Sequence, residues 1–529
     1  MTNTIKGTAE ALASLAQSKP ALLWAKCIAD TETPVSAALK LIEPERGDWL
    51  LESVEGGETR GRYSLIGLAP DLMFRAQGSV CAINRAWALD RTAFEPIEAD
   101  PLSALRTLVA ECRIDPLPNG LPSALACLVG YFAYESYGLV EAIPRPNANP
   151  IAVPDMVFVR PSLILIFDRL ADELWFVAPL WPSQTTPKRA VEAASERIET
   201  AISRLALPIP TSTVRPEPVE GLSFSRSSKE QCFDKLSTNG LEKPVTTLTP
   251  TLSDGAYAKM VMAAKEHITA GDIFQVVLAQ RFTAPFTLPP FQLYRALRRI
   301  NPSPFLYYLD LPGFAVVGSS PEILVRVRDD EVTIRPIAGT RPRGANAAQD
   351  LANRDALLAD PKECAEHLML LDLGRNDVGR AATPGSVCVT DSFMVEKYSH
   401  VMHIVSNVTG RLSAGKDALD ALFAGFPAGT VSGAPKVRAA QIIAELEGET
   451  RGIYAGGIGY FGPDGGMDSC IVLRTGIVKD GILHVTAGAG IVADSDPDYE
   501  QRECEAKAGA LIAAAREAVR VASEVGYGQ

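Results

Sequence analysis

The chain has 529 residues, of which 47% are hydrophobic and 22% are charged, and its formal net charge at pH 7 is −12. These are ordinary globular values, which allow about three domains of roughly 150 residues with a sizeable core. The acidic balance argues against a nucleic acid as partner, although a local pocket can still be basic enough to hold a small anion.

The first 207 residues predict a mixture of helices and strands. A short surface helix is expected within residues 1–20, and residues 188–206 carry apolar positions at helical spacing. Between them, apolar runs alternate with turn signals and predict strands or buried segments. These runs are 21–29, 48–54, 62–70, 124–135, and 161–180, which reads as two strands around a turn.

Residues 208–253 break this pattern. From 208 to 250 the sequence contains six prolines and many serines and threonines, and it shows little periodicity. Such a composition predicts a mobile linker or an insert. The chain is therefore expected to consist of an N-terminal domain at 1–207, this linker, and a second domain at 254–521.

The second domain alternates short strands with helices. Its first helix is expected to have Ser253 or Asp254 as N-cap and to run to about Ala270. The strands that follow come in hairpins and not in regular βαβ units. This arrangement favours an α+β fold with largely antiparallel sheets.

A first pair of carboxylates lies in residues 360–373, which are predicted to be helical. Asp360, followed by a proline, suits the N-cap position. Glu363 and Glu366 are three residues apart and therefore share a face of the helix. Glu363 also suits a capping box with Asp360, which explains its presence without any function.

A second pair lies in residues 496–511, where a proline again opens a predicted helix. Glu500 and Glu503 share a face, and Lys507 lies one turn beyond Glu503. Two helices that present carboxylates in this way could converge on one Mg²⁺ ion, because Mg²⁺ prefers oxygen ligands and keeps waters or substrate oxygens in its other positions. Spacing alone leaves a solvated, ion-paired helix face as the alternative.

An arginine and a glycine-rich stretch are predicted to meet in a hairpin. The dipeptide at 480–481, Asp-Gly, is a strong signal for a two-residue turn. The resulting register places Arg474 opposite Ala487, beside the stretch 488–490. Glycines let a ligand approach backbone N–H groups, and an arginine binds a carboxylate with two hydrogen bonds, so an anion site is one interpretation. An arginine that reaches solvent beside a glycine bend is the other.

Three further candidates stand alone in the sequence. Thr430 lies in a small-residue loop before a helix, within 426–443, where an anion site and ordinary helix capping are both compatible with the pattern. Glu322 is a general acid if it is buried near a substrate, and otherwise a loop carboxylate. His403 lies in an apolar, strand-like run and acts as a base only if it faces the pocket; a structural histidine is the alternative.

The nine cysteines are scattered and form no CxxC pair. This pattern indicates reduced thiols and not a disulfide framework or a zinc ribbon. The N-terminus lacks the apolar stretch of a signal peptide, and no run of about 18 apolar residues predicts a membrane span. We therefore expect a cytoplasmic protein without a membrane partner.

Several segments resemble the chorismate-utilising enzymes, and within that family most closely the anthranilate synthase component I (large subunit) group. The resemblance covers about 20–205 and 254–515. It implies large, mostly antiparallel sheets packed as a sandwich with helices outside, and a chorismate-binding catalytic domain at 254–521. The segments that carry it are LLESVEGGETRGRYSLIG, IRPIAGTRPRG, DPKECAEHLMLLDLGRNDVGR, YSHVMHIVSNVTG, FPAGTVSGAPKVRAAQII, YAGGIGYF and DYEQRECEAKAGAL.

The resemblance assigns roles to the candidates. Glu366 and Glu503 match the family's Mg²⁺ ligands, with Glu363 and Glu500 nearby. The implied catalytic residues are Glu322, which protonates the departing C4 hydroxyl, His403, which is linked to the expulsion of pyruvate, and Thr430 beside the ring. The implied substrate-binding residues are Ala338, Gly339, Thr340, Thr430, Tyr454, Arg474, Gly488, Ala489, Gly490 and Lys507.

Two positions discriminate within the family. Some aminodeoxychorismate synthases have a nucleophilic lysine where this chain has Ala338. Isochorismate and salicylate synthases use a lysine near the position of Gln275, and a glutamine cannot serve as a base. Both absences leave external ammonia as the nucleophile, which is the chemistry of anthranilate synthase.

The resemblance also implies partners and regulation. Because no glutaminase nucleophile motif is recognisable, ammonia is expected from a separate glutamine amidotransferase subunit in a heterotetramer or other hetero-oligomer. Aminodeoxychorismate synthase and a silent, tryptophan-binding regulatory subunit are the alternative functions. Tryptophan is expected as a feedback inhibitor at a site formed by Glu52, Ser53, Asn301, Pro302, Ser303, Pro304, Phe305, Leu306 and Tyr460.

Overall fold

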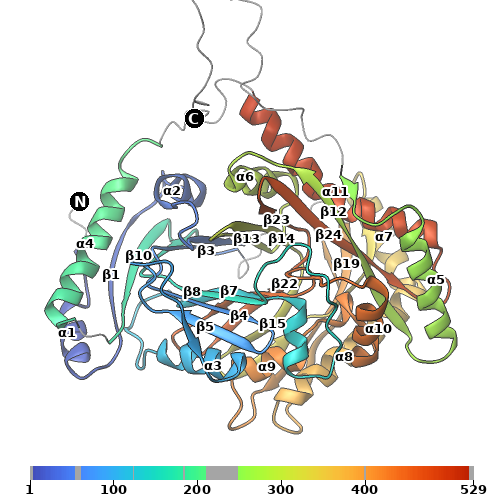
Figure 1. Ribbon diagram of the computed structural model, residues 1–529, viewed down its shortest axis with the longest axis horizontal. Helices are drawn as coiled ribbons and strands as arrows, with labels where there is room; N and C mark the ends of the chain where they lie inside the picture. Colours follow the sequence, from blue (N-terminus) through green and yellow to red (C-terminus); the bar gives the residue numbers. More distant parts are fainter. Residues whose placement is uncertain are drawn as a thin grey trace, which may run out of the picture.

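Two large β-sheets lie face to face, and helices cover their outer sides (Figure 1). The computed structural model describes residues 4–53, 61–122, 124–182, 185–209, 248–397 and 401–523. Over these ranges every ladder between named strands is antiparallel. The predicted α+β class, with antiparallel sheets packed as a sandwich, is confirmed.

The first sheet has 12 strands within the described residues and joins the two ends of the molecule. In spatial order its strands are β1 (Ala21–Ile28), β10 (Glu173–Leu180), β9 (Leu163–Asp168), β3 (Tyr63–Leu68), β2 (Trp49–Glu52), β13 (Phe305–Leu311), β14 (Phe314–Ser320), β23 (Thr475–Lys479), β24 (Ile482–Ile491), β12 (Gln275–Pro285) and β11 (Thr249–Pro250), with β20 (Gly433–Ala434) paired to β12.

The second sheet also has 12 strands in the part of the chain that the structure describes. Its order is β17 (Ile337–Pro342), β19 (Val401–Arg411), β16 (Glu331–Ile334), β15 (Ile323–Arg328), β22 (Met467–Ile471), β21 (Gly457–Phe461), β7 (Leu128–Phe132), β8 (Met156–Arg160), β4 (Leu72–Gln77), β5 (Val80–Asn84) and β6 (Glu95–Ile97), with β18 (Cys388–Lys397) paired to β19.

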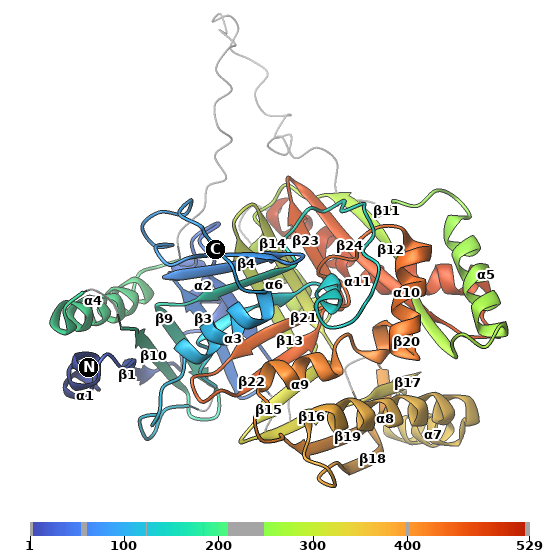
Figure 2. The same cartoon turned by 60° about the horizontal axis from the view of Figure 1, so that its bottom comes forward.

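Helices pack on the outer faces of both sheets, and Figure 2 shows α7 and α8 lying along the end of the second sheet. No helix in the described ranges is both long and apolar enough to cross a membrane. The helices are α1 (Thr8–Ala16), α2 (Pro34–Leu41), α3 (Pro101–Glu111), α4 (Pro187–Leu205), α5 (Ala256–Thr269), α6 (Pro290–Ile300), α7 (Ala347–Ala359), α8 (Pro361–Ala381), α9 (Ala418–Gly425), α10 (Lys436–Glu447) and α11 (Pro497–Ser523), with 3₁₀ turns η1 (Tyr134–Leu139) and η2 (Gly429–Val431).

Both sheets contain strands from before and after the predicted linker. In the first sheet β2 pairs with β13, and in the second β7 pairs with β21, so each sheet has one seam where the two stretches meet. One continuous hydrophobic core includes side chains from both stretches. The two stretches therefore fold around shared sheets. Of the predicted linker, residues 210–247 lie outside the described residues.

The start of α5 differs from the prediction. The N-cap of this helix is Gly255, at a positive φ of 73° and without a side-chain cap, and not Ser253 or Asp254. The backbone N–H of Ala256 donates to the carbonyl of Ser253 at 3.0 Å. A turn at 253–256 therefore replaces the side-chain cap, which a glycine in the left-handed region makes possible.

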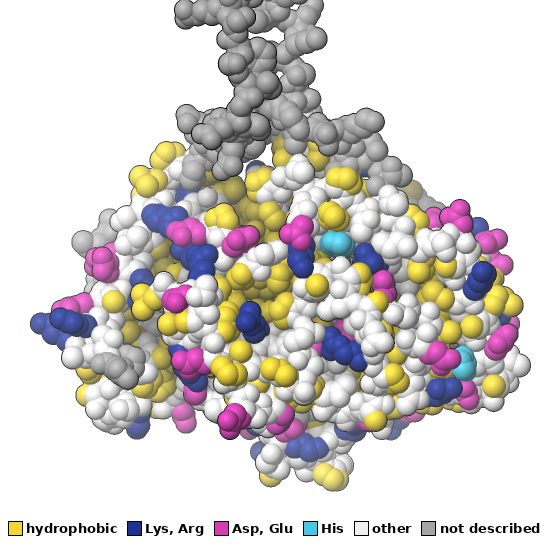
Figure 3. Space-filling model, viewed as in Figure 1, with side chains coloured by type: hydrophobic (Ala, Val, Ile, Leu, Met, Phe, Trp, Pro, Cys, Tyr) yellow, Lys and Arg dark blue, Asp and Glu magenta, His cyan; other side chains and the backbone are white. Residues whose placement is uncertain are grey.

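Charges of both signs are dispersed over the face shown in Figure 3, with Lys and Arg side chains interspersed among Asp and Glu side chains. Hydrophobic side chains gather in the hollowed middle of the same face. The acidic net charge of −12 is therefore not concentrated as a single patch on this face.

Candidate active site and a second cavity

Glu322 is a buried carboxylic acid at the junction of β14 and β15. Its side chain is only 8% exposed. Burial raises the pKa of Glu322 to about 8, although a hydrogen bond from Thr430 and the charge of Arg474 act in the opposite direction. The hydroxyl of Thr430 donates to Glu322 Oε1 at 3.1 Å. Glu322 therefore holds a proton at neutral pH, as a general acid must.

His403, on β19, is half-buried beside a bulge in β17. Burial and the charge of Arg474 lower the pKa of His403, so the ring is neutral near pH 7. Its Nδ1 lies 2.9 Å from the carbonyl oxygen of Gly339 and 3.2 Å from Thr340 Oγ1. A hydrogen on Nδ1 donated to that carbonyl makes Nε2 the basic nitrogen of the ring. The bulge thus sets the tautomer that a general base requires.

The positive φ of Gly339, 65°, orients this carbonyl. The residue lies where the pairing between β17 and β19 shifts register. A Cβ at this position would lie 3.2 Å from Glu363 Oε2, so the first acidic helix passes directly beside the bulge. Ala338, one residue earlier, is 9% exposed.

The charge of Arg474 lowers the pKa of both Glu322 and His403, which indicates that Arg474 lies near both side chains. The predicted two-residue hairpin is confirmed, with Gly476 paired to Val485. The predicted pairing of Arg474 with Ala487 is wrong. Arg474 has a positive φ of 48° and precedes β23, so the chain turns out of the ladder at this point, and the pairing of β23 with β24 ends at Gly476 and Val485.

Gly488 and Gly490 form a wall of β24 that other side chains approach closely. A Cβ on Gly488 would lie 2.8 Å from the hydroxyl oxygen of Tyr454, and one on Gly490 would lie 2.7 Å from Gln275 Nε2. The Lys507 ammonium donates to the carbonyl of Gly488 at 3.1 Å. A side chain at 488 would also meet the backbone carbonyl of Leu278 at 2.8 Å, so this glycine is needed for close packing, while Ala489 beside it is buried.

The carboxylates of α8 and α11 converge. Burial raises the pKa of Glu366, and the charges of Glu363 and Glu503 raise it further. Burial and the charge of Glu503 likewise raise the pKa of Glu500. Glu503 itself pairs with Lys507 at 2.6 Å. Glu366 and Glu503, 137 positions apart in the chain, therefore lie close enough for their charges to interact.

The convergence suits an oxygen-preferring cation. No group of three or more His, Cys, Asp or Glu residues forms a metal cluster within the described ranges. Mg²⁺ does not need one, because it is usually held by one or two carboxylates while waters and substrate oxygens complete the octahedron. The charges of Lys362 and Lys507 lower the pKa of Glu366 and Glu500, but burial and the neighbouring carboxylates outweigh them, so further positive charge would be favourable here. Glu366 and Glu503 have the chemistry of such a pair.

Glu363 has a structural partner of its own. Its carboxylate accepts from Arg341 at 3.0 Å, and Arg341 also pairs with Asp360 at 2.7 Å. Asp360 caps α8 as predicted, accepting from the backbone N–H groups of Lys362 and Glu363. This arginine was not singled out in the sequence, because nothing in a lone Arg on a strand indicates which helix it faces.

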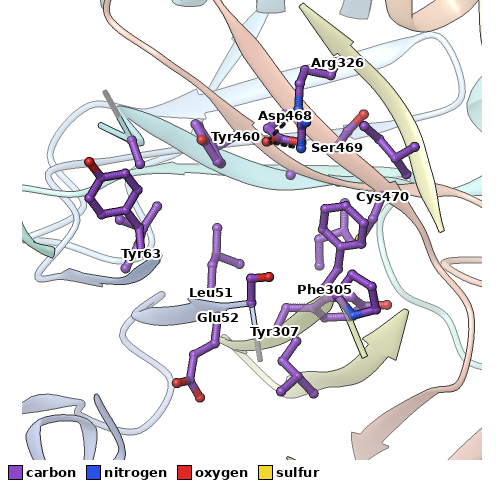
Figure 4. Close-up of a pocket in the computed structure, with 18 of the residues that line it drawn as sticks. Leu51, Glu52, Tyr63, Phe305, Tyr307, Arg326, Tyr460, Asp468, Ser469 and Cys470 are labelled. Carbon is purple, nitrogen blue, oxygen red and sulfur yellow. Dashed lines mark hydrogen bonds and ion pairs between the residues drawn. The ribbon is translucent and has the colours of Figure 1, made fainter. Parts of the chain in front are cut away.

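A separate cavity of about 370 Å³ opens between the two sheets (Figure 4). Leu51 and Phe305 contribute apolar side chains, and Tyr460 lies on the opposite wall. Arg326 and Asp468, joined by hydrogen bonds of 3.1 and 3.2 Å, add a polar patch. This mixture of an apolar wall and paired charges suits a small amphipathic ligand.

Only some of the residues expected to bind tryptophan line this cavity. Those that line it are Glu52, Ser53, Pro304, Phe305, Leu306 and Tyr460, whereas Asn301, Pro302 and Ser303 are not among its lining residues. The carboxylate of Glu52 points away from the cavity (Figure 4), where it binds Arg298 at 2.7 Å and the hydroxyl of Tyr294 at 2.5 Å. Glu52 therefore contributes to the cavity through its strand and not through its charge.

Two buried ion pairs behind the site were also not anticipated. Lys436 binds both carboxylate oxygens of Asp377 at 3.0 Å, and Arg451 binds Glu447. Sequence patterns give no signal for them, since Lys436 begins a helix and Arg451 follows one, positions where a solvated charge is ordinary.

Comparison with known proteins gives one consistent answer. A family model for chorismate binding enzymes matches residues 54–513. The anthranilate synthase component 1 of Cereibacter sphaeroides is 49% identical over 508 residues, which cover 96% of this chain and 97% of that protein. The protein of the same name from Pseudomonas aeruginosa is 44% identical, over 92% of this chain and 94% of its own length.

Solved structures agree. The crystal structure of anthranilate synthase component I from Streptococcus pneumoniae superposes with a TM-score of 0.70 at 33% identity, covering 92% of this chain and 98% of that one. The menaquinone-specific isochorismate synthase MenF of Escherichia coli shares the fold, with a TM-score of 0.66 at 19% identity over 96% of this chain and 99% of its own. The chain belongs to the anthranilate synthase component 1 family of chorismate-binding enzymes.

Proposed function

We propose that this protein converts chorismate and ammonia to anthranilate, pyruvate and water, the first step of tryptophan biosynthesis. The observation that carries the proposal is the proton-holding Glu322, placed within reach of Thr430 and Arg474. Hydroxide is a poor leaving group, and a buried acid with a pKa of about 8 can protonate it at neutral pH. The identity to relatives of this name supports the same reaction.

The site provides for both halves of the reaction. Glu322 protonates the C4 hydroxyl as it leaves and ammonia attacks C2. The neutral His403 then accepts the C2 proton as pyruvate departs with the electrons of its C–O bond. Arg474, Lys507 and the glycine wall are proposed to bind the two carboxylates of the substrate, which is supported by the contact of Lys507 with Gly488.

Glu366 and Glu503 are the residues that would hold Mg²⁺, with Glu363 and Glu500 beside them. When bound there, Mg²⁺ supplies positive charge that balances a substrate carboxylate. Lys507 links this region to the substrate wall, because it contacts both Glu503 and the carbonyl of Gly488.

Ammonia is proposed to come from a second subunit, a glutamine amidotransferase, in a hetero-oligomer. The name "component 1" carried by the relatives supports a second component. A reducing, cytoplasmic setting is supported by the eight described cysteines, each of which is a free thiol.

An assay of product identity tests the proposal. Purified chain supplied with chorismate, Mg²⁺ and an ammonium salt should form fluorescent anthranilate. Isochorismate or aminodeoxychorismate as sole product would overturn the assignment. Ala338 supports anthranilate over the covalent aminodeoxychorismate route, since this position offers no nucleophile.

We also propose that the cavity between the sheets is the site of feedback inhibition by tryptophan. Its apolar wall of Leu51 and Phe305 suits an indole, and the polar patch of Arg326 and Asp468 suits the charges of an amino acid. The support is the composition and the volume of the cavity, about 370 Å³.

A large side chain that fills this cavity from β2 should relieve the inhibition by tryptophan. Leu51→Trp places a large side chain into the cavity from β2, and we expect the inhibition constant for tryptophan to rise by about tenfold or more, or about 1.4 kcal/mol. The kcat without tryptophan should change little, because β2 pairs with β3 and β13, whereas Glu322 follows β14 and Thr430 lies in η2. Titration of the initial rate with tryptophan measures both quantities.

The matched control is Leu170→Trp, the same change at a side chain that is 66% exposed in the turn between β9 and β10. This variant should be inhibited like the unmodified enzyme. Unchanged inhibition of Leu51→Trp would place the regulatory site elsewhere.

A further inference from the structure

We propose that Arg451 and Glu447 are positioning residues: together they fix the loop of Thr430 against the glycine wall, and so set the distance between the acid and the substrate-binding strand. The role rests on the proposed function, since it concerns the same reaction. The observations that carry it are the hydrogen bonds of the buried Arg451 guanidinium.

Arg451 bridges two segments of the site through its guanidinium. Nη1 donates to the carbonyl of Val431 at 2.7 Å, next to Thr430 in the chain, and Nη2 donates to the carbonyl of Val277 at 2.6 Å. In the β12–β24 ladder Val277 pairs with Gly490. One side chain thus joins the loop that holds the acid's partner to the strand behind the glycine wall.

Glu447 completes the bridge from the end of α10. Its carboxylate receives Nε of Arg451 at 2.8 Å and Nη2 at 2.5 Å, and Oε1 also accepts the backbone N–H of Ala279 at 2.8 Å. Ala279 pairs with Gly488. The two residues therefore hold alternate positions of β12, which are the positions that face the two glycines across the ladder.

Aromatic rings hold the guanidinium in place. Its central carbon lies 4.7 Å from the ring centre of Tyr134 and 5.7 Å from that of Tyr454. Tyr454 is the residue whose hydroxyl lies against Gly488. An arginine suits this role because its planar group stacks on rings while it donates in several directions, which a lysine cannot reproduce.

The pair acts through its neighbours and not on the substrate. The Arg451 and Glu447 side chains are 2% and 6% exposed, and Nε, Nη1 and Nη2 of Arg451 each donate to a protein oxygen. Replacing Arg451 by lysine keeps the charge but cannot keep all of these bonds. The loop at 429–431 should then shift relative to the glycine wall.

Arg451→Lys tests the proposal through two readouts. We expect KM for chorismate to rise by about tenfold, because displacement of a binding strand by a fraction of an ångström weakens substrate orientation. The alkaline limb of the rate against pH should also move to higher pH, because the hydrogen bond from Thr430 lowers the pKa of Glu322 and is weakened when its loop moves. A purely structural role would move neither at temperatures well below the melting transition.

Arg281→Lys is the matched control. Arg281 lies on β12, the strand that Arg451 and Glu447 bind, and its guanidinium donates to Glu449, just beyond α10, at 3.2 Å. Its KM and pH profile should match those of the unmodified enzyme. If Arg451→Lys does so too, or if Arg281→Lys changes equally, the positioning role is overturned.

A second variant, Glu447→Gln, guards against poor folding of the first. It keeps an oxygen for Ala279 but removes the charge, and a smaller shift in the same direction is expected. A normal KM and an unmoved alkaline limb in this variant would contradict the proposal. Anthranilate formation by the unmodified enzyme is measured first, so failure of the proposed reaction is recognised separately.

Discussion

Glu322→Gln is expected to lower kcat by roughly 10²–10⁴-fold, the range associated with loss of a general acid. Glutamine preserves the size of the side chain and still accepts the hydrogen bond from Thr430, but it has no proton to give to the departing hydroxyl. Steady-state kinetics with chorismate and ammonium measure the loss. An active Glu322→Gln enzyme would show that another group protonates the leaving oxygen.

The same acid should shape the pH profile. Since burial raises the pKa of Glu322 to about 8, the activity of the unmodified enzyme should fall as the pH passes that value and the carboxyl loses its proton. Thr430→Val removes the bond that favours the charged form, so its alkaline limb should move to higher pH. Two profiles that coincide would argue against this assignment.

The stability of the fold should also fall as the pH rises, but over a lower pH range. The ordinary pKa of this carboxyl is 4.5, and in the folded protein it is about 8. At a pH between these two values the folded carboxyl keeps its proton while the unfolded one has lost it, so the free energy of unfolding falls as pH rises. The slope is about 1.4 kcal/mol per pH unit in that window. Glu322→Gln lacks this slope, and urea unfolding should show the variant gaining stability over the unmodified protein from pH 5 to pH 8.

Glu366→Gln and Glu503→Gln are each expected to lower kcat/KM by roughly 10²-fold or more and to weaken Mg²⁺ binding. Each substitution removes one of the two carboxylates, on α8 and α11, whose charges interact. Titration calorimetry of Mg²⁺ into the protein gives a readout that does not depend on turnover. Circular dichroism confirms that the variants remain folded.

Glu505→Gln is the matched control for the second carboxylate. Glu505 is exposed on the same helix and accepts from Gln501 at 2.8 Å, away from Glu366. Its Mg²⁺ affinity and activity should be unchanged. Normal Mg²⁺ binding by Glu503→Gln would remove that residue from the proposed metal site.

Much of the fold followed from local patterns. The Asp-Gly turn fixed the register of β23 and β24, and Asp360 with its proline marked the start of α8. Both depend on a few adjacent residues, so no distant contact was needed. The predicted N-cap of α5 was wrong because Gly255 adopts a left-handed conformation, which the neighbouring Ser253 and Asp254 do not indicate.

The candidate site, too, was predictable only where local patterns determine it. Its residue types were recognisable, but the position of Arg474 was not, because the positive φ that takes it out of the ladder has no signature in a non-glycine residue. Lys436 pairs with Asp377, which lies in a different helix, and Arg451 donates to the carbonyl of Val277, on a strand far away in the chain. Such contacts become visible only when the two sheets are assembled.

Glu322 lies between two residues that line the cavity. Pro321 and Ile323 line the cavity, while Glu322 between them receives the hydroxyl of Thr430. Tightly packed interiors transmit displacement, so an occupant that pushes on either neighbour also moves the acid. Leu51 projects into the same cavity from β2 of the other sheet, so a substitution there changes the fit of the proposed inhibitor without replacing either neighbour of the acid.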